Sequence, residues 1–497
     1  MISTLLLALV SLQPQVPSAR ARATAEYVTE SYGDGAIELM GELVRFPTFA
    51  HDDGSGVAHP AFAEMSAHLK QVAKEFGLDF ADHGAVVVLG LGDSSDRLGL
   101  VTHGDVQPAD GSKWARSPFE LDMESEPGRL VGRGTEDDKG PIACALYAMR
   151  GIRERGLPLK RRVELIISYT EESDWAPFRE FLEEHPAPAL NVAFDASYPV
   201  VVAEKGWCSI NVSLPVETGE ERGQAGRPTL ESFTGGFFLS QVPEGAEAVI
   251  SGCTPELEKA LRADAARAGE LQWTFERDGR GLVVRVLGKS AHSSEPEHGR
   301  NGITHMAALL GRHDWPPTAA ARMLQLIEER IGTGFYGELF GDLAYEHPFM
   351  GKLTLSFGTL KVQDGRLVGG INLRRPAGRD RGQVERTIHE ALDSWQAQSG
   401  VELEVSTYLS DPHMTRDAEH IPVLMETFRA YTGIAQAEPI SIGGGTHARL
   451  VPGGVNFGPA MPGVPYTGHT EHEYMTRDQF LLNLKMYTSL IVDLATE

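Results

Sequence analysis

Hydrophobic residues recur with two different periods in the first 200 residues. Spacings of three and four predict helices at 35–45, 60–76 and 141–155. Short runs rich in valine, isoleucine and leucine predict buried strands at 85–91, 98–103, 163–169 and 191–194. Because these strands alternate with helices, the region is expected to form an α/β fold, with a mostly parallel sheet flanked by helices.

The pattern changes at about residue 206. Apolar and polar positions now alternate, as they do in half-exposed antiparallel strands. Strands are predicted at 208–214, 282–287 and 401–408, and a helix at 421–432. We therefore predict an α+β domain built on antiparallel sheet at 206–405, inserted into a domain that both 25–205 and 406–497 form.

The N-terminus carries a candidate targeting segment. Residues 5–12 are apolar apart from Ser11, and Ala-Arg-Ala at 21–23 offers a cleavage site between small residues. The run is too short to span a bilayer but suits a signal peptide. We predict a leader at 1–24, export to the periplasm or the extracellular space, and no membrane insertion after leader removal. No basic residue precedes the run, however. The alternative is therefore that the leader is not a signal peptide and that the protein is cytoplasmic.

The composition narrows the classes of partner. The 497 residues include 45 basic and 69 acidic side chains, a net charge of −24. Such a surface repels phosphate backbones and anionic lipids, which argues against nucleic acid and membrane surfaces as partners. The three cysteines (Cys144, Cys208 and Cys253) form no closely spaced pair, so neither a thiolate zinc site nor a disulfide framework is encoded.

The predicted strands of the first domain end in residues that bind metals. His103 and Asp105 follow one strand, Glu171 and Glu172 another, and Asp195 a third. Each motif alone suits a surface strand end or a turn, but functional groups gather beyond the carboxyl ends of strands in open α/β sheets. Carboxylates so close together repel one another unless a cation lies among them. Imidazole and carboxylate ligands favour zinc, with manganese or cobalt as alternatives.

Four motifs together resemble those of the co-catalytic di-zinc metallopeptidases. This family includes carnosinase, bacterial dipeptidases, glutamate carboxypeptidase, aminoacylase and succinyl-diaminopimelate desuccinylase. The motifs are HGDVQP at 103–108, GRGTEDDKGP at 132–141, TEE at 170–172 and FD at 194–195. The resemblance extends from about residue 35 to the C-terminus and implies a zinc-peptidase-like catalytic domain with an inserted lid.

The resemblance implies two Zn²⁺ per chain. Asp137 would bridge both cations, and the Asp137–Asp138 peptide bond would be cis. The first cation would be completed by His103 and Asp195, and the second by Glu172 and His469.

The choice of His469 as a ligand rests on its spacing. It stands four residues before Glu473, as the ligand does in the family, whereas His472 is expected to be an outer or surface residue.

Roles in the reaction also follow from the resemblance. Glu171 would be the general base, and Asp105 would position His103. His292, in GKSAHSS at 288–294, matches a family histidine that hydrogen-bonds the oxyanion of the tetrahedral intermediate.

Substrate contacts follow in the same way. Arg374, in NLRRP at 372–376, would bind the free carboxylate of the substrate, because a guanidinium fork binds both oxygens at once. Gly444, in GGGTHAR at 443–449, would lie beside the substrate together with His292. Ser240 stands where relatives often carry asparagine, so that contact is lost or mediated by water. Whether His447 contacts substrate stays open.

The inserted domain, roughly 200 residues, is about twice the length of the dimerisation lid in dimeric relatives. Within the family, the chain resembles most the monomeric bacterial dipeptidases, which have a doubled lid. The resemblance and the length favour a monomer, with a homodimer as the alternative.

The predicted function is metal-dependent hydrolysis of amide bonds in dipeptides or other short peptides with a free carboxylate, by a bridging hydroxide with Glu171 as its base. The alternatives are a deacylase of N-acyl or N-succinyl amino acids, and a catalytically silent peptide-binding relative.

Overall fold

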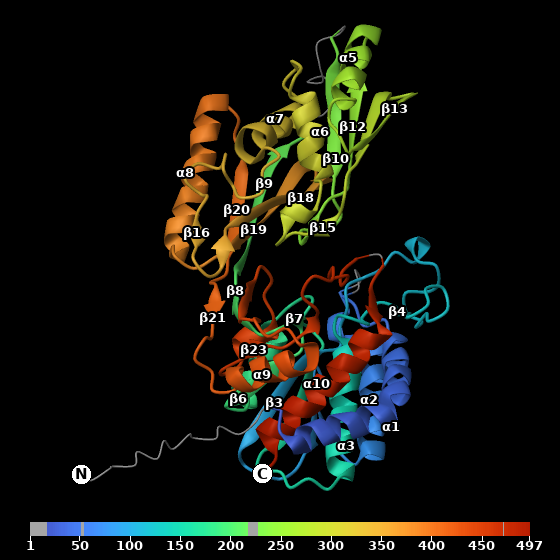
Figure 1. Cartoon of the computed structure of the whole chain (residues 1–497). Coiled ribbons are helices and arrows are strands. Elements are labelled where there is room, and N and C mark those ends of the chain that lie inside the picture. The colour runs from blue at the N-terminus through green and yellow to red at the C-terminus, as the bar shows by residue number, and fades with distance from the viewer. Residues whose placement is uncertain (1–16, 51–53, 217–226, 471) are drawn as a thin grey trace, which may run out of the picture. The chain divides into compact units, whose positions relative to one another are not determined.

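The computed structural model describes residues 17–50, 54–216, 227–470 and 472–497, and the apolar run of the predicted leader lies outside them. The described chain divides into two compact units, whose elements Figure 1 labels. Unit 1 comprises the chain up to Val202 with Met414–Ile440 and Thr446–Glu497, and unit 2 comprises Ala203–His413 with Ser441–Gly445. The first segment of unit 2 thus begins three residues before the expected boundary at 206 and ends eight residues after that at 405, the latter because strand β20 (Glu404–Leu409) pairs with strand β9 (Gly206–Pro215) of unit 2.

Unit 1 is built on a nine-stranded mixed sheet. Its strands follow the order β1 (Asp79–Asp82), β2 (Val86–Leu91), β5 (Arg162–Ser168), β3 (Arg97–His103), β6 (Leu190–Ala193), β23 (Val455–Asn456), β8 (Val201–Glu204) and β21 (His413–Met414), with β22 (Ile440–Ile442) beside β8. Strands β5, β3, β6 and β23 run parallel. The predicted α/β fold is confirmed, but β2 runs antiparallel to β5, because a buried apolar run does not encode strand direction.

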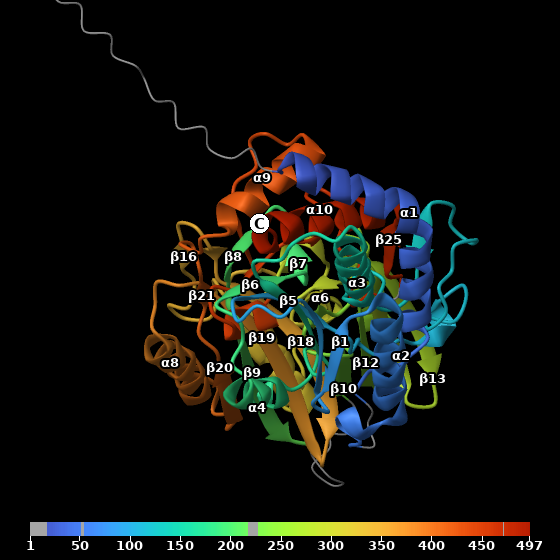
Figure 2. The same cartoon turned by 90° about the horizontal axis from the view of Figure 1, so that it is seen from below.

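Helices cover both faces of this sheet. They are α1 (Ala19–Val44), α2 (Pro60–Phe76), α3 (Lys139–Glu154), α4 (Ala176–Glu184), α9 (Ile421–Thr432) and α10 (Arg477–Ala495). Helices α3 and α10 pack on β3 and β5, and α1 packs on both helices. Phe178 of α4 packs with Val101 and Ile166 of the sheet. Figure 2 shows α3 and α10 on one side of the sheet and α4 on the other.

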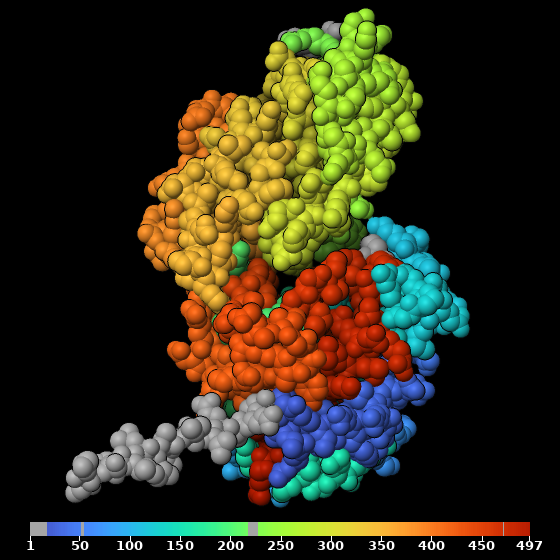
Figure 3. Space-filling view, in the orientation of Figure 1, coloured from blue at the N-terminus to red at the C-terminus, as the bar shows by residue number. Residues whose placement is uncertain are grey.

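Helix α1 is much longer than the helix predicted at 35–45. Its first half buries Ala21, Ala25 and Val28, at helical spacings, although polar residues surround them in the sequence. The Ser18 side chain caps the helix by accepting from the Ala21 N–H, and the Ser18 N–H donates to the Asp493 carboxylate of α10 at 3.1 Å. The blue N-terminal segment accordingly lies beside the C-terminal one in Figure 3. Residues 19–24 of the predicted leader thus begin α1, and the leader itself stays a prediction.

Unit 2 contains an eight-stranded sheet whose neighbours all run antiparallel. Its order is β13 (Gln272–Asp278), β14 (Gly281–Leu287), β12 (Gly245–Ser251), β10 (Thr229–Gly235), β18 (Thr354–Gln363), β19 (Arg366–Arg375), β9 (Gly206–Pro215) and β20 (Glu404–Leu409). The two four-stranded halves meet where Gly235 of β10 pairs with Leu360 of β18. The helices are α5 (Pro255–Ala265), α6 (Gly302–Leu310), α7 (Ala319–Leu326) and α8 (Arg381–Ser399).

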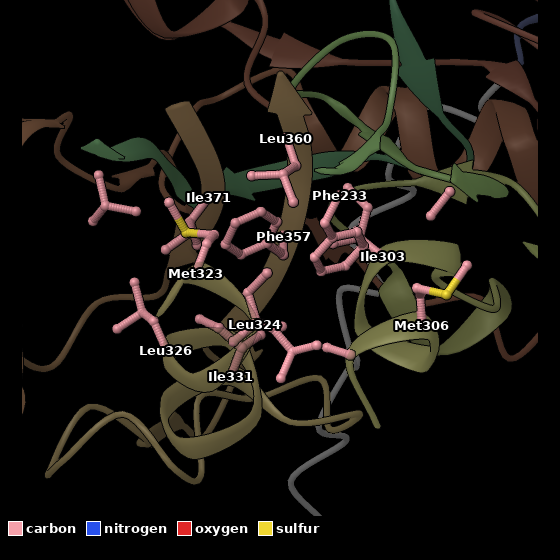
Figure 4. Close-up of a cluster of buried hydrophobic side chains, with 14 of the residues drawn as sticks. Phe233, Ile303, Met306, Met323, Leu324, Leu326, Ile331, Phe357, Leu360 and Ile371 are labelled. Atoms are coloured by element: carbon pink, nitrogen blue, oxygen red, sulfur yellow. The ribbon is translucent and has the colours of Figure 1, made fainter. Parts of the chain in front are cut away.

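One hydrophobic core joins the two halves of unit 2. Phe233 comes from one half and Phe357 from the other, and both are fully buried. Figure 4 shows these rings with Ile303 of α6 and Met323 of α7. Since each half contributes to the same core, the doubled sheet is a single packed layer.

Two short two-stranded ribbons position loops that carry expected site residues. In unit 1, β25 (Tyr474–Thr476) pairs with β4 (Arg129–Val131), which brings the chain before β25 beside the chain after β4. In unit 2, β11 (Gln241–Val242) pairs with β15 (Ala291–His292). The remaining ribbons are β7 (Ala196–Ser197) with β24 (Pro459–Ala460), and β16 (Glu346–His347) with β17 (Gly351–Lys352). Among the helices of the described residues, none combines the length and apolar character that a bilayer crossing requires.

Candidate active site

The carboxyl ends of three parallel strands bring acidic and imidazole groups together. His103 ends β3, Glu171 follows β5 and Asp195 follows β6. The His103 Nε2 lies 3.5 Å from Asp195 Oδ1. Glu171 joins them, since ligand atoms of all three residues lie within 4.8 Å of one another. The sequence-predicted convergence at this sheet edge is therefore present in the structure.

Asp137 connects this group with a second one. Its Oδ1 lies 2.8 Å from His103 Nε2, and its Oδ2 lies 3.0 Å from His469 Nε2. The same His469 nitrogen is 2.8 Å from Glu172 Oε1. The Asp137–Asp138 peptide bond is cis, as the resemblance implied. All five expected metal ligands thus belong to one continuous cluster in unit 1.

His472 lies apart from this cluster. Its side chain is 51% exposed and pairs with Glu126 at 2.8 Å. Of the two C-terminal histidines, His469 is therefore the one among the acidic groups.

Asp105 contacts its neighbours through both its backbone carbonyl and its side-chain carboxylate. The His103 Nδ1 is 2.9 Å from the Asp105 backbone carbonyl and 3.5 Å from the Asp105 carboxylate. That carboxylate instead accepts the N–H groups of Glu171 at 3.1 Å and Glu172 at 2.9 Å. Asp105 therefore orients His103 mainly through its main chain and fixes the Glu171–Glu172 turn with its side chain.

His447, whose role the sequence left open, is buried in unit 1. Its ring stacks on Phe178 at 4.2 Å and meets the edge of Trp175 at 5.1 Å. Trp175 in turn donates its indole N–H to the Glu171 carbonyl at 2.6 Å. A substrate contact of His447 stays a prediction.

Unit 2 gathers the expected substrate residues. Arg374 is buried and donates to Asn372 Oδ1 at 2.9 Å, to the Gly443 carbonyl at 3.3 Å and to Ser293 Oγ at 3.4 Å. Next to Ser293, the His292 Nδ1 lies 2.7 Å from Ser294 Oγ. Gly443 allows this close packing, because a Cβ atom there would lie 2.5 Å from the Ser294 Cβ. Arg374, His292 and the segment containing Gly444 are thus neighbours.

Two other positions of unit 2 have structural contacts. The backbone carbonyl of Ser240 accepts from the Ser293 N–H at 3.0 Å, which holds Ser240 beside the His292 segment. Arg375 is buried and pairs with Asp411, so it anchors the end of β19.

Burial and excess negative charge shift the pKa values of the cluster in unit 1. Burial, with the charges of Asp137 and Glu172, raises the pKa of Asp195 to about 7 although His103 opposes the shift. Burial also raises the pKa of Glu171 well above its usual value, and the Asp195 charge adds to the effect. Burial lowers the pKa of His469, but Glu172 and Asp137 outweigh it and raise that pKa to about 10. Without additional positive charge, the cluster therefore retains protons.

The donor set fits divalent cations. Among the described residues, two groups of three have ligand atoms within 4.8 Å of one another: His103, Glu171 and Asp195, and His103, Asp137 and Glu172. Imidazole nitrogens and carboxylate oxygens, without a thiolate, are typical of catalytic zinc sites and also suit manganese or cobalt. The shortage of positive charge is what bound cations would correct.

A family model covers most of this structure. The model of peptidase family M20/M25/M40 matches residues 99–493, which includes every member of the cluster. The chain belongs to this family.

Relatives of this M20/M25/M40 peptidase support the assignment. "Putative dipeptidase YtjP" of Bacillus subtilis (strain 168) is 32% identical over 409 residues, which cover 81% of this chain and 84% of the relative. "Beta-Ala-Xaa dipeptidase" of Lactobacillus delbrueckii subsp. lactis is 29% identical over 478 residues, 95% of this chain and 93% of the relative. Human carnosine dipeptidase 1 shares the fold, with a TM-score of 0.60 at 16% identity over 96% of this chain and 99% of that chain.

Three residues of the peptidase that the sequence did not single out contact the expected metal ligands. Gln107 donates to Glu172 Oε2 at 3.0 Å, Tyr466 donates its hydroxyl to Asp137, and Glu473 accepts from the Asp137 N–H at 3.1 Å. Gln107 lies inside a motif that was recognised, and Glu473 served only as a spacing marker for His469.

Proposed function

We propose that this M20/M25/M40 peptidase hydrolyses the amide bond of dipeptides and other short peptides with a free carboxylate. The observation that carries the proposal is the chain of contacts of 2.8–3.0 Å from His103 through Asp137 and His469 to Glu172, with Glu171 beside it. The dipeptidase names of the two relatives support the substrate class.

Two divalent cations, Zn²⁺ foremost, would be held by the cluster of unit 1. We assign Asp137 to both cations, His103 and Asp195 to one, and Glu172 and His469 to the other. When bound, the cations would supply Lewis-acid activation of water and of the amide carbonyl.

Glu171 acts as the general base and then as the general acid. Its carboxylate takes the proton of the attacking water and later gives it to the leaving amine. Hydrogen bonds fix the Glu171 main chain on both sides, from its N–H to Asp105 and from Trp175 to its carbonyl.

His292 and Arg374 contribute polar groups to the substrate. His292 donates a hydrogen bond to the developing oxyanion, and the Ser294 hydroxyl at its Nδ1 holds the ring orientation. Arg374 binds the substrate carboxylate with its guanidinium fork, and its hydrogen bonds to Asn372 and Gly443 hold that fork in place.

A substrate panel tests the proposed reaction. The zinc-loaded protein is offered dipeptides, including those that begin with β-alanine, together with N-acetyl and N-succinyl amino acids, and products are identified by mass spectrometry. We expect hydrolysis of dipeptides that stops when a chelator removes the metal. Preferential cleavage of the acylated amino acids would instead show that the protein is a deacylase. Binding of dipeptides without turnover would show that it is a catalytically silent relative.

The variant Arg374→Ala tests the carboxylate contact. Hydrogen bonds to a charged group contribute about 1.5–3 kcal/mol, so we expect kcat/KM for dipeptides to fall roughly 10- to 150-fold. Dipeptides with an amidated C-terminus should show little further loss in the variant, because they lack the carboxylate. The control is Arg366→Ala on the same strand, where the arginine pairs with Glu404 at 3.0 Å near the surface. An equal loss for the amidated peptides would contradict the assignment.

A further inference from the structure

Two segments of unit 1 that lie far apart in the chain hold each other through buried carboxylates. The Glu473 Oε1 accepts the backbone N–H groups of Glu136 at 3.0 Å and Asp137 at 3.1 Å. In return, the Glu136 Oε2 accepts the backbone N–H of Thr467 at 2.8 Å and its hydroxyl at 2.9 Å. The exposed fraction is 3% for Glu136 and 0% for Glu473. The segment that contains Asp137 and the segment that contains His469 are therefore linked in both directions.

An arginine strengthens the same link. Arg133 Nη1 donates to the second oxygen of Glu473 at 2.8 Å, and Arg133 Nη2 donates to the Thr470 carbonyl at 3.0 Å. Arg133 is 2% exposed, so both charges of the pair are shielded from water. A buried ion pair of this kind tolerates the loss of one partner poorly, because the other charge is left uncompensated.

The linked segment holds His469 in an unusual backbone conformation. Its φ angle is +63°, a left-handed value that residues other than glycine rarely adopt. Such a conformation persists when the surrounding contacts fix it. Thr467 supplies a further contact, since its hydroxyl oxygen, which donates its one proton to Glu136, accepts from the Tyr474 N–H at 3.1 Å.

Building on the cation binding proposed above, we infer that these residues position the ligands that unite the two cations. We call the set the carboxylate clasp; its members are Arg133, Glu136, Thr467 and Glu473. The clasp holds Asp137 through its main chain and His469 through its loop, and Asp137 Oδ2 and His469 Nε2 lie 3.0 Å apart. None of its members belongs to the three-residue ligand groups found among the described residues, so they act as positioning residues.

Two variants, Glu473→Gln and Thr467→Val, each weaken the clasp with little change of shape. Glu473→Gln places an amide N–H₂ group against Arg133 or against the two backbone N–H groups. Thr467→Val removes the hydroxyl that donates to Glu136, and Thr467→Ser keeps it. Loss of a residue that orients a metal ligand typically lowers metal affinity 10- to 100-fold.

The experiment is a titration of the metal-free full-length variants with Zn²⁺ alone, in competition with a chromogenic chelator and well below the unfolding temperature. We expect Glu473→Gln and Thr467→Val to bind Zn²⁺ about 10- to 100-fold more weakly, and Thr467→Ser to bind nearly as the unmodified protein does. Hydrogen exchange of the amides at 136–137 and 467–470 should be faster in the two weakened proteins. The matched control is His472→Ala, which changes a histidine of the same loop that pairs with Glu126 at the surface.

A purely structural role predicts a different pattern. In that case the variants melt at lower temperature but bind Zn²⁺ with unchanged affinity, and this result overturns the clasp. If Glu473→Gln does not fold, the comparison of Thr467→Val with Thr467→Ser decides by the same criterion. If the unmodified protein binds fewer than two Zn²⁺, the proposed function fails and the clasp proposal with it, whereas two tight sites that the variants leave unchanged contradict the clasp alone.

Discussion

Glu171→Gln is expected to lower kcat about 10²- to 10⁴-fold while both cations stay bound. Glutamine has nearly the same shape and can keep the main-chain contacts with Asp105 and Trp175, but its amide cannot accept the proton of the attacking water. The measurements are steady-state turnover of a dipeptide and the metal content of the purified variant.

The control for this variant is Asp174→Asn. Asp174 is an exposed acid three residues further on, and its replacement should leave both turnover and metal content unchanged. The structure also groups Glu171 with His103 and Asp195 as a possible ligand set. If Glu171 is a ligand, the glutamine variant will lose metal together with turnover, and the assignment as general base is wrong.

Asp137→Asn is expected to lose both cations and with them essentially all hydrolysis. The Asp137 carboxylate is the group that approaches His103 on one side and His469 on the other, at 2.8 and 3.0 Å. An asparagine offers one neutral oxygen in place of two charged ones, so neither cation keeps its shared ligand. The metal content of the variant after dialysis should therefore be well below that of the unmodified protein.

The outcome for Asp137 differs in kind from that for Glu171, because metal and activity fall together in one variant and only activity falls in the other. Asp110→Asn provides a control, since Asp110 is exposed and caps a short turn through the Ser112 N–H. Retention of two tightly bound cations by Asp137→Asn would remove Asp137 from its bridging role.

Local periodicity predicted most of the fold, and its failures have physical causes. The helices at 60–76 and 421–432 coincide with α2 and α9, because their apolar faces are continuous and their ends carry proline and glycine. The first half of α1 was missed, since its buried residues are small and stand among charged ones. The direction of β2 was missed, because direction depends on which strand it meets and not on its own residues.

The candidate site also has a part that the sequence could predict and a part that it could not. The grouping of proposed ligands inside compact motifs, such as His103 and Asp137, could be predicted because each motif is local in the sequence. The contacts of Glu473 and Tyr466 with Asp137 could not be predicted, because they join segments hundreds of residues apart. The contact of the Asp105 carbonyl with His103 could not be predicted either, because it depends on the path of the main chain. Export and the monomeric state stay predictions.

The eight-stranded sheet of unit 2 gives the protein a freedom that paired identical subunits lack. In a symmetric dimer every substitution appears twice, once in each copy. Here both halves are encoded separately, so His292, which follows β14 of one half, and Arg374, on β19 of the other, can be altered independently. Selection can therefore change the surroundings of His292, the proposed oxyanion contact, without changing those of Arg374, the proposed carboxylate contact. The shared core around Phe233 and Phe357 keeps the two halves in register.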